Sequence, residues 1–205
     1  MKDSLYRIIK RIIDVIGSLI GMIVFSPTIM AIIIAIKLDD GQEIIFKQKR
    51  VGKDGKEFMM YKFRSMIPNA HAKRNQLMDL NQTGGPIFKI QNDPRMTKVG
   101  AFLRAHSLDE IPQFINVLKG DMSMVGPRPA LPEEVEEYTD AELARLQVLP
   151  GLTGLWQVSG RSNLTYQEMI SLDIAYIEDK NIILDLIIIL KTVLQMFTPS
   201  KSGAF

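Results

Sequence analysis

The longest apolar stretch of the chain lies near its N-terminus. Residues 15–36 form a run of 22 residues without a charged side chain. As a straight helix this run would extend about 33 Å, which is enough to cross the hydrocarbon core of a bilayer. Ser26-Pro27 falls in its middle, and proline removes a helix hydrogen bond and collides with the preceding turn. The pattern therefore predicts a membrane helix that is kinked or broken at Ser26-Pro27.

Positive charges stand on both sides of this run. They are Lys2, Arg7, Lys10 and Arg11 before it, and Lys37, Lys47, Lys49, Arg50, Lys53 and Lys56 after it. Positive charge marks the cytoplasmic side of a membrane segment, so a helix that enters, bends and leaves by the same face satisfies both flanks. An ordinary transmembrane helix with a proline kink is the alternative. A signal peptide fits poorly, because no small-residue cleavage site follows the run.

The remaining pattern predicts a mostly helical α+β fold. Residues 43–66 hold two apolar-aromatic runs around Asp54-Gly55, a standard turn pair, and this predicts a β-hairpin. Helices are expected in three further stretches: residues 99–118, residues 132–147 as an exposed acidic helix, and residues 166–180. Residues 66–100, broken at Gly84-Gly85-Pro86 and Asp93-Pro94, are expected to form a short helix and loops, and residues 150–160 a glycine-punctuated loop.

The last apolar segment covers residues 181–197. It is apolar on most sides but is interrupted by Asp185 and Lys191, and it is too short to cross a bilayer. It is either a core helix or a helix at the membrane interface with Lys191 reaching outward. We expect its buried side in the core and the rest near lipid.

Composition and charge narrow the classes of protein. The chain has 205 residues and no cysteine, which excludes disulfide scaffolds, thiol catalysis and iron–sulfur clusters. Its two histidines, His71 and His106, are too few for a His-rich metal site. The net charge of +2 argues against a nucleic-acid binder. Residues 1–64 carry 12 basic and 7 acidic side chains, and such a basic, apolar end suggests a membrane with anionic lipids.

The candidate chemistry centres on the adjacent carboxylates Asp109 and Glu110. The chain has no Walker loop, GxGxxG or HExxH motif. One carboxylate could act as a nucleophile on phosphorus while the other holds Mg²⁺, which prefers oxygen ligands. Arg104 and Arg128 could bind phosphate oxygens through paired N–H groups. A structural alternative is open, because Ser107-x-x-Glu110 matches a capping box that merely starts a helix. Pro112 complicates that alternative, since it would then fall inside the helix.

Several other side chains have a structural and a functional interpretation. Lys62 and Arg64 could be strand-face charges or phosphate ligands. Asp173 and Asp185 lie in apolar helical patterns, where a carboxylate needs a partner, and salt bridges to Arg104 or Arg128 are the default expectation. His106 is expected to be a packed or surface histidine. Trp156 could be an interface anchor, a core residue or a stacking platform.

At these motifs the sequence resembles the bacterial sugar transferases, also called polyprenyl-phosphate hexose-1-phosphate transferases or monotopic phosphoglycosyl transferases. The similar segments are KRIIDVIGSLIGMIVFSPTIMAI, IFKQKRVGKDGKEFMMYKFRSM, RAHSLDEIPQFINVLKGDMSMVGPRP, LPGLTGLWQVSGRS, LDIAYIEDKNIILDLIIILKTV and the final GAF. They cover nearly the whole chain in the family's order. The resemblance is to the minimal catalytic form, and it implies two parts: a re-entrant membrane helix over residues 1–38 and a catalytic domain over residues 39–205.

The resemblance implies a reaction. Such enzymes move a sugar-1-phosphate from a UDP-sugar to undecaprenyl phosphate and release UMP, in a ping-pong, Mg²⁺-dependent mechanism. Carried over by motif, Asp109 is the nucleophile and Glu110 helps it hold Mg²⁺. Lys62, Arg104 and Arg128 would bind phosphates, and Asp173 and Asp185 match supporting aspartates of the family. Ser26-Pro27 matches the family's re-entrant helix break.

The resemblance also implies a location. The enzyme would be monotopic in the bacterial inner membrane, with its active site on the cytoplasmic face, in contact with phospholipids and surrounded by interfacial amphipathic helices; a homodimer is left open. The LWQVSGRS and GAF segments are most similar to the hexose branch of the family, with galactose or glucose donors.

One position departs from the family's pattern. Leu149 stands before Pro150 where many relatives have arginine, so any phosphate contact of that arginine is either absent here or supplied by another residue, such as Arg145 or Arg161. Two other functions are weighed: a non-catalytic membrane module of envelope polysaccharide assembly, and a membrane phosphohydrolase.

Overall fold

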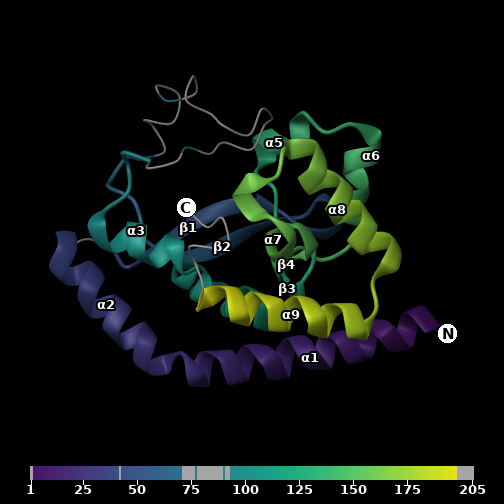
Figure 1. Ribbon diagram of the computed structural model, residues 1–205, viewed down its shortest axis with the longest axis horizontal. Helices are drawn as coiled ribbons and strands as arrows, with labels where there is room; N and C mark the ends of the chain where they lie inside the picture. The colour runs from purple at the N-terminus through teal and green to yellow at the C-terminus, as the bar shows by residue number, and fades with distance from the viewer. Residues whose placement is uncertain (1, 42, 71–76, 78–89, 91–92, 198–205) are drawn as a thin grey trace.

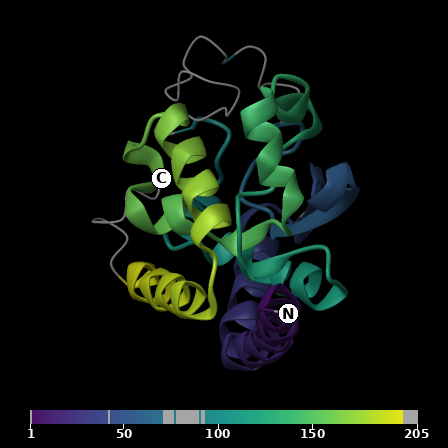
Figure 2. The same cartoon turned by 90° about the vertical axis from the view of Figure 1, so that its right-hand side faces the viewer.

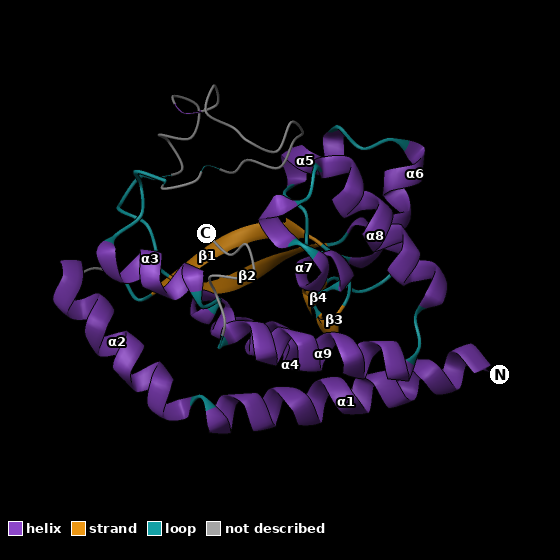
Figure 3. Cartoon of the chain, in the orientation of Figure 1, coloured by secondary structure: helices purple, strands orange, loops and turns teal. Residues whose placement is uncertain are grey.

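The computed structural model describes residues 2–41, 43–70, 77, 90 and 93–197. Within these ranges helices predominate and two small two-stranded sheets accompany them (Figure 3). The predicted mostly helical α+β class is therefore confirmed. The Gly84-Gly85-Pro86 breaker, His71 and the final Gly-Ala-Phe lie outside the described residues, as does most of the weakly patterned stretch between the hairpin and residue 93.

The chain begins with a bent helix pair, α1 (Lys2–Val24) and α2 (Ser26–Asp40). The two helices meet at an angle of 60°. Pro27 has no N–H to donate to the carbonyl of Ile23, as a continuous helix would require. The Ser26 hydroxyl donates to that carbonyl instead, at 2.7 Å. The predicted break at Ser26-Pro27 is thus confirmed, and its local cause is the missing proline donor.

The bent pair lies at one side of the molecule together with α9 (Ile182–Met196) (Figure 1). Figure 2 shows the same three helices grouped on that side. No single described helix is long and apolar enough to cross a membrane, whereas Ser4–Val24 and Ser26–Asp39 together meet that test. Large apolar side chains are exposed along α1 and α9, among them Ile8, Ile12, Ile16, Ile20 and Ile23 on α1 and Leu186, Leu190 and Leu194 on α9. An apolar surface of this kind is typical of a membrane or protein interface.

The predicted β-hairpin is confirmed. β1 (Ile45–Val51) pairs antiparallel with β2 (Glu57–Phe63), from Ile45 opposite Phe63 to Val51 opposite Glu57. The short 3₁₀ turn η1 (Lys53–Gly55) joins them. Asp54 and Gly55 have φ values of 57° and 74°, the positive values that favour Asp-Gly in a tight turn.

The helix expected over residues 99–118 is broken into three elements. They are α3 (Lys98–Ala105), the 3₁₀ helix η3 (Leu108–Gln113) and α4 (Phe114–Lys119). α3 ends at Ala105, and Ser107, directly before η3, has a left-handed conformation with φ 56°. Pro112 then removes the hydrogen bond that a continuing α-helix would need. The prediction of one helix is wrong, and the two breaks leave Asp109 and Glu110 on a short turn of their own.

The prediction of an exposed acidic helix over residues 132–147 is also wrong. The segment forms α5 (Pro132–Glu136), α6 (Asp140–Leu143) and the 3₁₀ helix η4 (Ala144–Gln147). Thr139 starts α6 as an N-cap whose side chain accepts from Glu142 N. Glu134 and Glu142 are buried, because they pair with Arg128 and with the Tyr166 hydroxyl. Partners elsewhere in the fold explain why both carboxylates are buried, and the periodicity of the sequence does not reveal such partners.

Residues 150–160 contain a strand and a helix, so the loop prediction is wrong for most of them. β4 (Gly151–Thr153) pairs in parallel with β3 (Ser123–Val125), and α7 (Leu155–Ser159) follows. A Cβ on Gly151 would lie 2.1 Å from the backbone N of Gly126, so glycine here permits two backbones to approach closely. After the short 3₁₀ turn η5 (Arg161–Asn163), α8 (Tyr166–Asp179) confirms the helix predicted over residues 166–180.

A buried apolar cluster connects the bent helix pair to the turn that carries Asp109. Ile36 of α2, Phe63 of β2, Leu103 of α3 and Ile111 and Phe114 pack together in it. The Phe114 ring stacks on Phe25 at the helix break, with ring centroids 6.4 Å apart. The break and the turn are thus packed against each other.

Candidate active site

Lys62 faces both adjacent carboxylates. It extends from β2, and its Nζ donates to Glu110 Oε1 at 2.7 Å and lies 3.8 Å from Asp109 Oδ2. The side chain of Asp109 is 7% exposed and that of Glu110 is 30% exposed. The structure therefore brings together three of the residues that the sequence singled out. Lys62 precedes Asp109 by 47 positions and Glu110 by 48.

The capping-box interpretation of Ser107 and Glu110 is wrong. Ser107 adopts a left-handed conformation and its side chain accepts no capping hydrogen bond. The Glu110 carboxylate is engaged by Lys62. Neither half of a reciprocal cap is therefore formed, and the pair is held by the 3₁₀ turn and by the lysine.

The two carboxyl groups have different electrostatic environments. Burial raises the pKa of Asp109, and attraction by Lys62 offsets only part of that rise. Burial also acts on Glu110, but Lys62, Arg161 and Arg104 together bring its pKa below the usual value. Neighbouring carboxyl groups whose pKa values are pushed apart are typical of sites where the two take different roles.

Two pockets meet at this pair. The larger, here called the basic pocket, has a volume of about 490 Å³, and its arginines are Arg50, Arg64, Arg95, Arg104 and Arg128. The smaller, here called the apolar pocket, has a volume of about 240 Å³, and its apolar side chains include Phe25, Phe114, Ile189, Val193 and Met196. Seven residues line both pockets: Lys62, Arg104, Asp109, Glu110, Leu152, Trp156 and Gln157. The carboxylates therefore stand between a cationic space and one lined by the helix break and α9.

Arg104 and Arg161, which the sequence singled out as phosphate ligands, line pockets that Asp109 and Glu110 also line. Arg104 lines both pockets from the last turn of α3, and Arg161 lines the apolar pocket. The Arg161 Nε donates to the carbonyl of Gln157 at 3.0 Å. Of the two arginines considered as substitutes for the one absent before Pro150, Arg161 is at the site, whereas Arg145 lines neither pocket.

Arg128 lines the basic pocket and is held from several sides. Its Nη1 and Nη2 donate to the two carboxylate oxygens of Glu134, at 2.9 and 3.4 Å. Its carbonyl accepts from Arg145 Nη2 at 3.2 Å, and the next carbonyl, that of Pro129, accepts from Arg50 Nη1 at 3.0 Å. Arg128 is thus fixed in the wall of the basic pocket before any ligand arrives.

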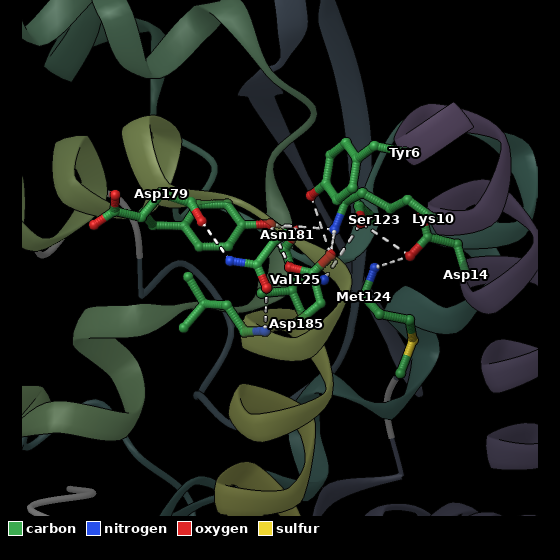
Figure 4. A network of polar contacts seen from close by, with 11 residues as sticks. Tyr6, Lys10, Asp14, Ser123, Met124, Val125, Asp179, Asn181 and Asp185 are labelled. Atoms are coloured by element: carbon green, nitrogen blue, oxygen red, sulfur yellow. Dashed lines mark hydrogen bonds and ion pairs between the residues drawn. The ribbon is translucent and has the colours of Figure 1, made fainter. Parts of the chain in front are cut away.

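Asp173 and Asp185 are buried and paired, but not with the partners expected. Asp173 Oδ2 accepts from Arg145 Nε at 2.9 Å, because α8 faces η4. Asp185 Oδ2 accepts from Lys10 Nζ at 2.9 Å, because α9 lies along α1 (Figure 4). The default expectation of salt bridges to Arg104 or Arg128 is wrong. Neither aspartate lines either pocket; Asp173 joins α8 to η4, and Asp185 joins α9 to α1.

The donor set at the pair fits Mg²⁺. This ion is usually bound through one or two carboxylates, with substrate phosphates and water completing its shell. Asp109 and Glu110 are adjacent and line both pockets. In the described ranges no three His, Cys, Asp or Glu side chains form a cluster of metal-site type.

His106 contacts the last turn of α3. Its Nδ1 lies 2.9 Å from the carbonyl oxygen of Phe102, and its ring packs on the ring of Phe102, as expected for a packed or surface histidine.

The sequence interpretation missed a set of polar contacts that fasten α1 to the rest of the molecule (Figure 4). Asp14 Oδ1 accepts from Ser123 Oγ at 2.9 Å and from Met124 N at 2.8 Å. Arg11 donates to the carbonyls of Val117 and Leu118 at the end of α4. The available signal was the spacing of Lys10 and Asp14, which places two charges on one helix face at the edge of an apolar run.

Comparisons with known proteins show which family the chain is similar to. The family described as bacterial sugar transferase matches residues 5–199. The chain is 46% identical over 188 residues to "Galactosyl transferase CpsE" of Streptococcus agalactiae, covering 91% of this chain and 42% of that protein. It is 38% identical to "Exopolysaccharide production protein ExoY" of Rhizobium meliloti, covering 90% of this chain and 83% of that protein. It is 41% identical to the "Undecaprenyl-phosphate galactose phosphotransferase" of Salmonella typhimurium, covering 91% of this chain and 40% of that protein.

Proposed function

Because the chain belongs to the bacterial sugar transferase family, we propose that it transfers a sugar-1-phosphate from a UDP-sugar to undecaprenyl phosphate for polysaccharide synthesis. The products are UMP and a lipid-linked diphosphate sugar. The observation that carries the proposal is the position of Asp109 and Glu110 where the basic and apolar pockets meet. A soluble anionic donor and a lipid acceptor require such different neighbouring spaces.

The basic pocket suits the donor. The diphosphate of a UDP-sugar carries negative charge on oxygens that guanidinium and ammonium groups bind well. Lys62, Arg104 and Arg128 line this pocket and Arg161 lies on the other side of the carboxylate pair. We assign these four cations to the phosphates of the donor and of the reaction intermediate.

In the first step an oxygen of Asp109 attacks the β-phosphorus of the donor. The bond from that phosphorus to the bridging oxygen of UMP breaks, and UMP leaves with the electron pair. The sugar-1-phosphate is then held as an acyl phosphate on Asp109. The buried position of this carboxylate supports the assignment, because a poorly solvated carboxylate is a stronger nucleophile than a hydrated one.

Asp109 and Glu110 would hold Mg²⁺ when it is bound. The ion would supply positive charge next to the phosphoryl oxygens and so stabilise the charge of the transition state. Lys62 hydrogen-bonds Glu110 and thereby orients this carboxylate. Lys62 and Arg104 add fixed positive charge to the same space.

The apolar pocket suits the lipid acceptor. Phe25 at the helix break and Ile189, Val193 and Met196 of α9 line it, and α1 and α9 expose apolar side chains beside it. In the second step a phosphate oxygen of undecaprenyl phosphate attacks the same phosphorus. The bond to Asp109 breaks, and the free carboxylate returns for the next turnover.

This chemistry favours a monotopic enzyme on the cytoplasmic face of the inner membrane. UDP-sugars are water-soluble, whereas the acceptor phosphate lies at the level of the lipid headgroups. Basic residues stand on both sides of the uncharged run over residues 15–36, which favours a re-entrant path in which both ends stay cytoplasmic. Residues 1–38 would then form the membrane part and residues 39–205 the catalytic part.

We propose galactose or glucose as the sugar. Two of the relatives named above, CpsE and the Salmonella phosphotransferase, are described as acting with galactose. The hexose-type LWQVSGRS segment supports the same choice.

The decisive experiment measures UMP release and lipid-linked product with UDP-sugars, undecaprenyl phosphate and Mg²⁺. We expect UMP and lipid product in equal amounts, and protein-bound label of about one per active site when a labelled donor is given without lipid. Free sugar phosphate in place of lipid product would indicate the phosphohydrolase. No UMP release with any donor would indicate the non-catalytic module.

A further inference from the structure

Buried polar atoms without partners gather in one wall of the basic pocket. Among the residues that the structure describes, no hydrogen-bond partner reaches Gln113 Nε2, Trp156 Nε1 or Gln157 Oε1. All three residues line the basic pocket, and Gln113 is only 2% exposed. Leaving buried donors and acceptors unpaired is unfavourable, so three of them in one pocket wall point to a ligand that pairs with them.

The three side chains are held by rigid elements next to the carboxylate pair. Gln113 ends the 3₁₀ helix η3, three residues after Glu110, and residues three apart project from the same side of such a helix. Trp156 in α7 packs on the buried cluster of Tyr166, Met169 and Ile170. Gln157 follows it, and its Nε2 lies 3.5 Å from the carbonyl of Leu152. These groups are positioned before a ligand binds.

The chemistry of the wall matches a sugar better than a phosphate. Gln113 Nε2 and Trp156 Nε1 are neutral donors, whereas Gln157 Oε1 is an acceptor. A phosphate oxygen satisfies donors only. A sugar hydroxyl both donates and accepts, and the C–H face of a pyranose can pack on an aromatic ring such as Trp156.

The position of Trp156 and Gln157 indicates which part of the donor they contact. Both residues line the basic and the apolar pocket. In the proposed transfer UMP is present only in the first step and the lipid only in the second. The sugar phosphate is present in both, and so it must adjoin the residues that the two pockets share.

We propose that Gln113, Trp156 and Gln157 form a hexose-recognition subsite that determines which sugar the enzyme accepts. The indole of Trp156 packs on the pyranose ring, and the two amides pair with its hydroxyls. This assignment rests on the proposed function, because the two-step transfer places the sugar at the shared wall.

Binding measurements test the subsite without turnover. UDP-galactose, UDP-glucose and UDP are titrated calorimetrically into the full chain in detergent, in an Asp109→Asn background that cannot form the covalent intermediate. We expect one UDP-hexose to bind more tightly than UDP. Gln113→Met or Gln157→Met should lower that affinity by about tenfold, while the affinity for UDP changes by less than about twofold. Trp156→Phe, which keeps an aromatic face, should have a smaller effect of the same kind.

Gln167→Met is the matched control, since Gln167 is exposed on α8 and its removal should leave all three affinities unchanged. Trp156 and Gln157 are only half-buried, so their variants carry the test if Gln113→Met does not fold. Equal losses for UDP and both UDP-hexoses, or no loss at all, would overturn the subsite. A wild-type chain that binds UDP-hexoses selectively but releases no UMP would instead refute the proposed transfer and leave the subsite standing.

Discussion

Asp109 and Glu110 are neighbours in the chain whose surroundings shift their pKa values in opposite directions, and the proposed mechanism gives them different tasks. Asp109→Asn keeps the size of the side chain but cannot attack phosphorus, so turnover should fall to background while the protein remains folded. Glu110→Gln should weaken the use of Mg²⁺, and raising the Mg²⁺ concentration should restore part of the activity. UMP release over a Mg²⁺ series measures both effects.

The control for these charge-removing variants is Asp140→Asn, an exposed carboxylate at the start of α6, which should not alter turnover. Normal turnover by Asp109→Asn would exclude the covalent mechanism. An equal fall to background in both variants, which added Mg²⁺ does not reverse in either, would show that the two carboxylates do not divide their roles as proposed.

The buried Asp173 should make the free energy of unfolding of the protein fall as the pH rises. Burial, only partly offset by Arg145, raises its pKa from 3.8 to about 6. The folded protein therefore holds this proton more tightly than the unfolded chain does. The resulting stabilisation is fully present below about pH 4 and is lost as the pH rises through 6. Relative to Asp173→Asn, the wild type should lose on the order of 3 kcal/mol of unfolding free energy across this window.

Denaturation of the wild type and Asp173→Asn in detergent between pH 4 and pH 7 measures this difference. Subtracting the two curves removes the contributions of groups that both proteins share. A difference that stays constant with pH, or that grows as the pH rises, would contradict the raised pKa.

At the scale of elements, Gly21 of α1 forms a notch for the active-site turn. A Cβ at this position would lie 2.6 Å from Cζ of Phe114, the residue that follows the 3₁₀ helix carrying Asp109. Gly21→Ala should push Phe114 and the turn out of place. We expect turnover to fall by about tenfold or more, since small misplacements of catalytic groups are costly.

Two comparisons separate this effect from general damage to α1. Gly17→Ala is the matched control, because its Cβ would meet only the Met124 side chain at an ordinary 3.7 Å. Phe114→Leu, which shortens the ring, should restore part of the activity of Gly21→Ala. Full activity of Gly21→Ala alone, or equal losses in the two alanine variants, would show that the notch does not position the turn.

At the scale of the whole molecule, the re-entrant path predicts that both ends of the bent pair are cytoplasmic. The chain has no cysteine, so Ser4→Cys and Lys56→Cys each introduce a single reporter. Neither should react with an impermeant thiol reagent in intact cells, and both should react in inverted membrane vesicles. Pro27→Ala restores the missing N–H and should move a fraction of one end to the periplasmic side. Reporters on opposite sides of the wild-type protein would establish a spanning helix.

Much of the fold follows from short-range chemistry and was predictable. The break at Ser26-Pro27 follows from a missing N–H, and the Asp54-Gly55 turn from the positive φ that these residues tolerate. The wrong helix predictions, over residues 99–118 and 132–147, share one cause. Apolar periodicity registers neither the left-handed Ser107 nor the capping box that Thr139 forms with Glu142, because neither feature changes the spacing of the apolar residues.

The sequence by itself determined the hairpin turn and the helix break, and it singled out the adjacent carboxylates Asp109 and Glu110, because each of these features depends on residues close together in the chain. Only the tertiary structure decided which charges meet. Lys62 reaches Glu110 across 48 positions, and Lys10 reaches Asp185 across 175. Asp173 pairs with Arg145, although a salt bridge to Arg104 or Arg128 was expected. A buried carboxylate must have a partner, but its partner is chosen by the packing of whole helices, which no local pattern records.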